Sequence, residues 1–285
     1  MFSRSAIKPH EIERPVLDLS GDILRAALQL MVAGSEDQGG IERYIDAVKL
    51  KSKMFRQALV DNDIADLDLE TFKGLCTFMA TVRRRISEQL NEDDFGDMRA
   101  AIVELFDETG HIDDRIARFC ARFPDDKKHR WVRDLATELL HNADPERVPL
   151  MNRWVWDAKS NTGVIREIWH GDDVDHIKIP VANDYGTYLM LREELSQFLS
   201  DNGIFRDVLY YVDVLCAQIY AQYICEQGGS YLRADFQAPE DPMQHTRRLL
   251  GLDGVQPGNG RTRLKSIDGE AFVLDDSSTL NPTEH

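Results

Sequence analysis

The sequence lacks the short motifs of the common enzyme families. It contains no P-loop, no GxGxxG fingerprint, no GxSxG nucleophile elbow and no protein-kinase signature. It also lacks low-complexity tracts and internal repeats at periods of about 20–50 residues. Nucleotide-dependent and acyl-transfer chemistry of the usual kinds are therefore disfavoured.

The chain is also short of positive charge. Its 285 residues include 34 Lys and Arg against 50 Asp and Glu, which gives a formal net charge of −16. A surface of this sign repels phosphate backbones and anionic lipid headgroups. We therefore expect neither a nucleic acid nor a membrane as a partner.

No long hydrophobic run is free of charged residues. The first residues, MFSRSAIKPHEIERP, have no apolar segment of the kind found in signal peptides. The most apolar later stretch, residues 204–224, is interrupted by Arg206, Asp207 and Asp213. These charges argue against a membrane span.

Cysteine is scarce, and its four positions are far apart. No CxxC pair occurs, and each cysteine lies in an apolar stretch with helical periodicity: Cys76, Cys120, Cys216 and Cys225. This pattern favours buried, reduced thiols over disulfides or zinc ligands. We expect the protein to be cytoplasmic.

Hydrophobic residues recur at helical spacing over most of the chain. Ser20 is the expected cap of the first helix, and Asp68 caps a third helix that runs to Leu90. A helix is also expected over 143–161, although two prolines leave its start open. The sequence thus predicts an all-α protein, a multi-helix bundle of about eight or nine helices.

Two segments depart from this periodicity. A short β excursion is expected near 164–181, because residues 176–181 alternate like a strand. The pair Asp268-Gly269 separates two short runs of β-type residues, which indicates a hairpin at 262–274. The predicted organisation is an N-terminal arm at 1–16, a helical core at 17–235 with a subdivision left open near 123, and a C-terminal arm at 236–285.

Three Glu-x-x-His pairs are candidate metal ligands: Glu108/His111, Glu138/His141 and Glu167/His170. Residues three apart share one face of a helix, and this pair recurs in carboxylate-bridged di-iron bundles. Gly110 interrupts the first pair and Gly171 follows the third, so only the second is plainly helical. The alternative is that these side chains occupy solvated helix ends.

The loop from His170 to His176 gathers two imidazoles and three carboxylates. Carboxylate oxygens combined with histidine favour Mn, Fe or Zn. The candidate metal site drawn from the loop and the helical pairs comprises Glu138, His141, Glu167, His170, Asp173 and His176. The alternatives for the loop are an exposed acidic turn and a catalytic acid/base pair.

A tryptophan- and arginine-containing segment is a candidate partner-binding surface. Its residues are Arg153, Trp154, Trp156 and Arg166. Trp and Arg are favoured interface anchors because they bury much area while keeping a polar group. The alternative is that one indole belongs to the core and the other is half-exposed.

Basic residues gather on two predicted helices: Lys49, Lys51, Lys53 and Arg56, then Arg83, Arg84 and Arg85. They predict a local positive surface on an acidic protein. Neither interleaved aromatic residues nor a groove-fitting helix accompanies it, so nucleic acid is not expected there. A solvated face or a self-association surface against an acidic neighbour is the preferred interpretation.

These observations leave two functional hypotheses. The first is a non-enzymatic helical adaptor, assembly or regulatory protein that acts through protein–protein contacts, with no cofactor. Exchange of the terminal arms between copies would make it a homo-oligomer. The alternative is a metal-dependent helical enzyme, hydrolytic or oxidative, with Mn, Fe or Zn held by the carboxylate and histidine residues.

Overall fold

The computed structural model describes residues 14–83, 85–86, 92–171, 174–231 and 243–252, and three short strands beyond them. The described residues are predominantly helical and contain ten α-helices, eight of which have eight residues or more. This confirms the prediction of a helical bundle. The helices are α1 (Gly21–Ser35), α2 (Ile41–Arg56), α3 (Leu69–Cys76), α5 (Glu92–Phe106), α6 (Ile112–Ala121), α7 (Trp131–Ala143), α8 (Val164–Glu167), α9 (Tyr185–Asp201), α10 (Val208–Tyr231) and α11 (Gln244–Leu249).

Side-chain caps fix where two of the helices begin. The Ser20 hydroxyl accepts a hydrogen bond from the Ile23 amide at 3.5 Å, and the Asp68 carboxylate accepts one from the Thr71 amide at 2.7 Å. Each cap satisfies one of the amides that a helix start leaves without an intrahelical acceptor. Both caps were predicted from the sequence, and both are confirmed.

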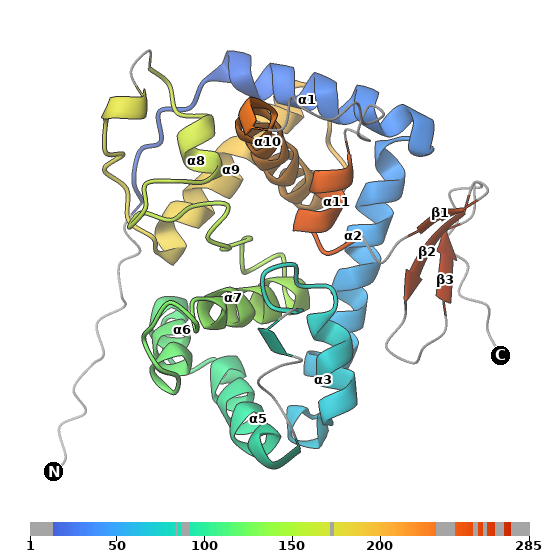
Figure 1. Cartoon of the computed structure of the whole chain (residues 1–285), viewed down its shortest axis with the longest axis vertical. Helices are drawn as coiled ribbons and strands as arrows, with labels where there is room; N and C mark the ends of the chain where they lie inside the picture. Colours follow the sequence, from blue (N-terminus) through green and yellow to red (C-terminus); the bar gives the residue numbers. More distant parts are fainter. Residues whose placement is uncertain are drawn as a thin grey trace, which may run out of the picture.

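The helices form two groups that α2 joins (Figure 1). The group at the top of Figure 1 contains α1 and α8 to α11, and the group at the bottom contains α3, α5, α6 and α7. Helix α2 packs against α7 of one group and α10 of the other. Residues on α2, α7, α10 and α11 can therefore meet in the interior.

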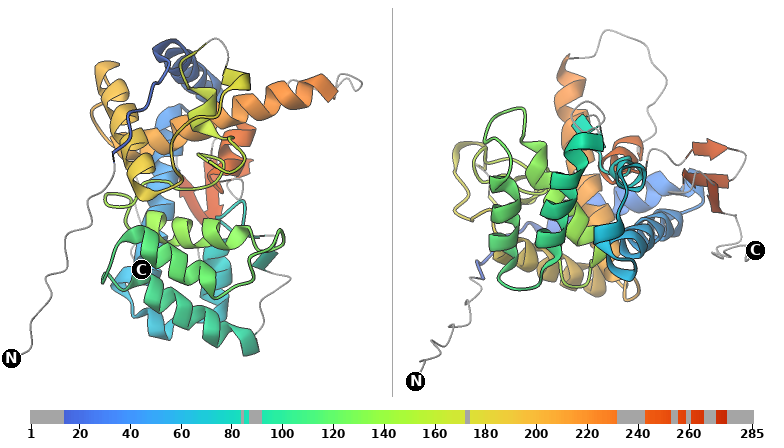
Figure 2. Two further views of the ribbon diagram at one scale, coloured as in Figure 1. Left: turned by 90° about the vertical axis from the view of Figure 1, so that its left-hand side faces the viewer. Right: turned by 90° about the horizontal axis from the view of Figure 1, so that it is seen from below.

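Helix α10 is the central helix of the upper group, with α1, α2, α8, α9 and α11 packed against it (Figures 1 and 2). Val214, Leu215 and Ala217 are fully buried along its length. By length and composition alone, Val208–Glu226 would suffice to cross a membrane. Core helices share this property, since apolar residues surround most of their circumference.

Helix α3 is shorter than predicted. It ends at Cys76, where the Thr77 hydroxyl donates to the Gly74 carbonyl at 2.6 Å, and the chain runs mainly in turns to Val82 before it is helical again at residues 83, 85 and 86. Met79 and Val82, later members of the predicted apolar stripe, are fully buried all the same. The periodicity therefore identified the buried side chains correctly, but not the end of the helix.

The prediction of a helix over 143–161 is wrong. Helix α7 extends to Ala143, and residues 144–162 are mainly turns and loops. The amides of Val155 and Trp156 both donate to the Asn152 carbonyl, which closes a tight turn. The prolines of this segment cannot donate the hydrogen bonds of a helix interior, so the chain takes turns instead.

The short β excursion predicted near 164–181 is not confirmed. Val164–Glu167 forms α8, Val174–His176 forms a single 3-10 turn, and residues 177–181 belong to no strand. The alternating burial is present, since Ile179 and Val181 are buried between exposed neighbours. The Asn161 side chain takes the place of a strand partner: its amide donates to the Ile177 carbonyl and its oxygen accepts from the Ile179 amide.

The segment predicted as a C-terminal arm contains a helix that packs on the core. Met243, Thr246, Leu250 and Leu252 of the α11 segment are buried. Beyond it, β1 (Gln256–Gly258), β2 (Arg261–Lys265) and β3 (Ala271–Leu274) pair antiparallel in the order β1-β2-β3. The Asp268-Gly269 turn lies outside the described residues, so the hairpin at 262–274 stays a prediction. Most of the predicted 1–16 arm also lies outside them.

Candidate functional site

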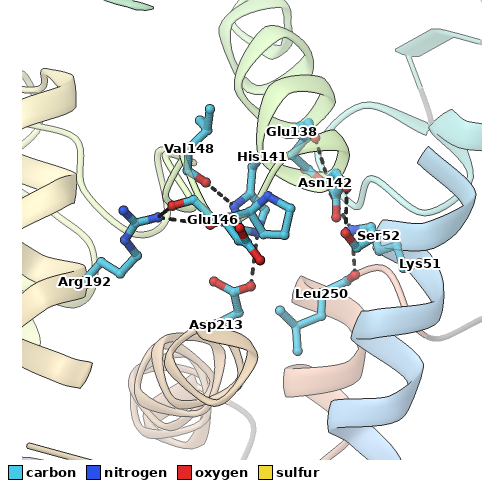
Figure 3. Close-up of polar contacts among 11 residues, drawn as sticks. Lys51, Ser52, Glu138, His141, Asn142, Glu146, Val148, Arg192, Asp213 and Leu250 are labelled. Carbon is cyan, nitrogen blue, oxygen red and sulfur yellow. Dashed lines mark hydrogen bonds and ion pairs between the residues drawn. The ribbon is translucent and has the colours of Figure 1, made fainter. Parts of the chain in front are cut away.

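Several buried polar side chains lie along one face of α7. Asp134, Glu138 and His141 are four and three residues apart, and this spacing puts them on one side of the helix. Each of the three is buried. Figure 3 shows Glu138 and His141 pointing toward side chains of α2 and α10 and the end of the α11 segment. Charged groups at this depth require internal partners.

His141 lies between two hydrogen-bond acceptors. Its Nδ1 is 2.8 Å from the Val148 carbonyl oxygen, and its Nε2 is 3.0 Å from a carboxylate oxygen of Asp213 on α10 (Figure 3). A carbonyl oxygen only accepts, so Nδ1 carries a proton, while Nε2 shares a hydrogen bond with the carboxyl group of Asp213. Burial lowers the pKa of His141, but the charge and hydrogen bond of Asp213 outweigh it and the pKa is raised. The contact with Asp213 therefore favours the protonated form of the His141 ring.

Lys51 and Glu138 form a second buried pair. The Lys51 ammonium is 3.4 Å from a Glu138 oxygen and 2.9 Å from the Leu250 carbonyl, which follows α11 (Figure 3). The Asn152 amide donates to the other Glu138 oxygen at 2.8 Å. Burial is the largest influence on both pKa values: it lowers that of Lys51 and raises that of Glu138. The pair therefore depends on its neighbours to stay charged.

Asp134 of α7 pairs with Arg153, which is the third ion pair formed by this helix. It is fully buried, and its carboxylate accepts from the Arg153 side chain at 2.7 and 3.1 Å and from the Arg153 amide at 3.2 Å. Burial lowers the pKa of Arg153, but its hydrogen bonds to Asp134 outweigh this and raise it. The α7 face thus fixes the loop after α7 as well as α2 and α10.

The network is inaccessible to a substrate. Lys51, Glu138, His141 and Asp213 are each 5% exposed or less. Their charged atoms are occupied by one another, by backbone carbonyls and by Asn152. These directional, charge-assisted hydrogen bonds tie five segments of the chain together: α2, α7, the loop after α7, α10 and the α11 segment.

In the part of the chain that the structure describes, the predicted metal ligands do not lie together. Glu138 and His141 lie in the core, while His170 and His176 are exposed on the loop after α8. His170 is 3.8 Å from Asp18, a contact between two exposed side chains, and Glu167 is half-buried on α8. Asp173 lies outside the described residues. Within the described part of the chain, no three His, Cys, Asp or Glu side chains form a group that could hold a metal ion.

Both tryptophans of the predicted partner surface are in the core. Trp156 is fully buried and Trp154 nearly so, while Arg153 and Arg166 are half-buried. Arg166 donates to the Asn161 carbonyl at 3.1 Å. A helix would have separated two indoles that are two residues apart, but the turn at this place directs both inward. The structure therefore places these four residues within the fold, and none is strongly exposed.

Lys51 was predicted on a basic surface, and this placement is wrong. Lys53 and Arg56 are exposed and Lys49 is half-buried against Asp207 at 3.0 Å, but Lys51 is buried. The sequence contains a signal for this: Tyr44, Val48, Lys51 and Phe55 follow helical spacing, so Lys51 lies within an apolar stripe. Asp213 gives the same signal among the apolar residues of α10.

Helix α1 carries three of the large hydrophobic side chains that are exposed among the described residues. Ile23, Leu30 and Val32 are 40–49% exposed, and Ala26 and Ala33 beside them are also exposed. No charged residue occurs between Ala26 and Ser35. Phe205, just before α10, is 78% exposed.

Comparisons with known proteins add no assignment. No family model matches the chain, and neither a curated protein nor a solved structure does.

Proposed function

We propose that the chain is a non-enzymatic helical adaptor, assembly or regulatory protein of the cytoplasm that acts through protein–protein contacts. The observation that carries this proposal is the exposed surface of α1 from Ala26 to Ser35, which has no charged residue and in which Gln29 is the only exposed polar side chain. Helices at the surface of a globular protein normally present charged and polar residues outward. A helix that is apolar on both faces is typical of one covered by a partner.

The buried charges support the same proposal. Glu138 and His141 are two of the six residues that the sequence offered for metal binding, and internal partners occupy both of them. Their contacts give both residues a structural role within the fold. Phe205 and the neighbouring Arg206, which is also exposed, supply a second contact point of the residue types that dominate interface energies.

The test is capture of partners by the full-length protein from its native cell, followed by mass spectrometry. Leu30→Asp should lose the partners, because a charge buried at an apolar interface is strongly unfavourable. Val103→Asp on α5 is the matched control, since Val103 is 43% exposed and Leu30 is 49% exposed. Equal capture by the wild type and both variants would contradict the role of the α1 face.

Metal analysis of the same preparation addresses the other function. Near-stoichiometric Mn, Fe or Zn, lost in a His170→Ala/His176→Ala variant, would overturn the proposal in favour of a metal-dependent enzyme. His141 is unsuitable for this purpose, because its replacement also removes a buried ion pair.

A further inference from the structure

We propose that the partner covering the exposed surface of α1 is a second copy of the same chain, joined through antiparallel pairing of the two α1 helices. This inference rests on the proposed function, because it names the occupant of the same surface. Three observations carry it: the geometry of the exposed stripe, the order of large and small residues along it, and the distribution of charge around it.

The stripe has the form of a helix–helix contact. Ile23, Ala26, Leu30 and Ala33 are spaced three, four and three residues apart, and all four are exposed. They lie on one flank of α1, about 110° around the helix from the buried residues Leu24, Ala27 and Met31. Ten residues of helix extend over about 15 Å, close to three turns. This is enough for one partner helix to lie along the stripe.

The order of the stripe residues is complementary to itself. A two-fold axis near residue 28 places Ile23 against Ala33 of the partner subunit. The same axis places Leu30 against Ala26 of the partner subunit. Each large side chain then faces a small one, which lets two helices approach closely and interdigitate. Parallel pairing would set Leu30 on its own equivalent and leave a gap beside each alanine.

Charge favours another copy over a membrane as the occupant. Each chain carries a formal charge of −16, so two copies repel one another except where their surfaces are neutral. The α1 stripe is neutral, because its nearest charges, Asp22 and Arg25, form an ion pair with each other. Helices that bind a membrane surface carry several Lys or Arg on the polar face, and Arg25 is the only basic residue of α1.

Sedimentation equilibrium of the full-length protein tests the pairing. The apparent mass should rise from 32.6 kDa toward twice that value as the concentration increases, as a reversible dimer with a small interface requires. Leu30→Asp should stay at 32.6 kDa throughout, and Val103→Asp should dimerise like the wild type. A wild type that stays monomeric, or a Leu30→Asp variant that dimerises normally, would overturn the inference.

Disulfide cross-linking tests the antiparallel register. Ala26→Cys and Leu30→Cys variants are made in a Cys225→Ser background, which removes the exposed native thiol. On mild oxidation, the two variants mixed together should form covalent dimers faster than either alone, because positions 26 and 30 face each other. Faster cross-linking of each variant with itself would contradict the antiparallel arrangement.

The outcomes separate this inference from the function on which it rests. If the wild type is monomeric but Leu30→Asp loses a different captured protein, the α1 face is a contact surface and the second copy is not its partner. If neither dimerisation nor capture depends on Leu30, both proposals fail. Far-ultraviolet circular dichroism of each variant establishes that the exposed substitutions leave the helices folded.

Discussion

His141 shows how a single residue couples the charge of the core to its folding. Its ring donates to a backbone carbonyl and shares a hydrogen bond with Asp213, and the nearby Asp213 favours the protonated ring in the folded state. The folded pKa is raised above the unfolded value of about 6.5. The stabilising contribution is therefore complete below the unfolded pKa and is lost as the pH rises through the folded pKa.

This linkage predicts a pH dependence that Asp213 controls. The free energy of unfolding of the wild type should fall as the pH rises through the folded pKa of His141. Asp213→Asn should flatten this fall and destabilise the protein by about 3–5 kcal/mol below it, since it leaves an unpaired buried charge. Urea unfolding at a series of pH values measures both effects.

Asp207→Asn is the control for that experiment. It breaks the half-buried pair of Asp207 with Lys49 and leaves the partners of His141 in place. The pH dependence of its unfolding should follow that of the wild type. A fall of equal size in Asp213→Asn and in the wild type would show that another group is responsible.

Lys51 is a buried charged residue that the sequence analysis placed on the surface. Its burial lowers its pKa, and the Glu138 carboxylate and the Leu250 carbonyl act against that loss of charge. Lysine is seldom fully buried without such partners. A charged residue at a stripe position is therefore better interpreted as half of an internal pair, with the other half on a facing helix.

At the scale of elements, the α11 segment depends on a close backbone approach. Gly251 follows it with a φ of +72°, and a Cβ at that position would lie 1.8 Å from the Phe78 carbonyl oxygen. The neighbouring Leu250 carbonyl accepts from Lys51, and the Thr246 hydroxyl donates to Gln218 at 2.7 Å. Only glycine permits both the conformation and the contact.

Gly251→Ala should therefore displace the α11 segment from the core. We expect a loss of stability of about 3 kcal/mol or more, from strain of a left-handed alanine together with overpacking against a carbonyl. Gly203→Ala is the matched control: its φ is +88°, but no atom lies within 4 Å of the added Cβ, so only about 1 kcal/mol is expected. Chemical denaturation gives the free energies, and hydrogen exchange of residues 243–252 reports the displacement. Equal losses in both variants would contradict the role of the contact.

The helices also differ in how well their limits could be predicted from the sequence. Caps at Ser20 and Asp68 and the apolar stripes are local patterns, and they placed most of the helices correctly. The end of α3 lies beside a distant segment, since the backbone of Phe78 closely approaches Gly251. Local periodicity contains no information about such contacts.

The site was predicted less well than the fold for a related reason. Glu138 and His141 were recognised as a polar pair on one helix face, and they do share that face. Their partners, Lys51 and Asp213, lie 87 and 72 residues away along the chain. Pairing over such distances is set by how α2 and α10 pack on α7, and a single sequence does not encode it in any short motif.

At the scale of the whole molecule, the positively charged surface around α2 is smaller than the lysines and arginines in the sequence of that helix indicate. Lys51 is buried, Lys49 pairs with Asp207, and the exposed Arg56 lies 3.7 Å from Asp61. Such exposed pairs are weak and are screened by salt. The acidic character of the chain therefore dominates the encounter of two copies, and the neutral stripe on α1 is the place where that repulsion is least.

This balance predicts how salt acts on the dimer. Raising the ionic strength from about 0.1 M to 1 M shortens the screening length from about 10 Å to about 3 Å, so repulsion between two chains of −16 each declines. The apolar contact along Ile23 and Leu30 has no charge to screen, so the association constant from sedimentation equilibrium should rise with sodium chloride. Association through the basic residues of α2 against an acidic neighbour would weaken instead, because salt screens attraction as well as repulsion. Leu30→Asp should remain monomeric at both ionic strengths, and its dimerisation at high salt would show that the association does not involve the α1 stripe.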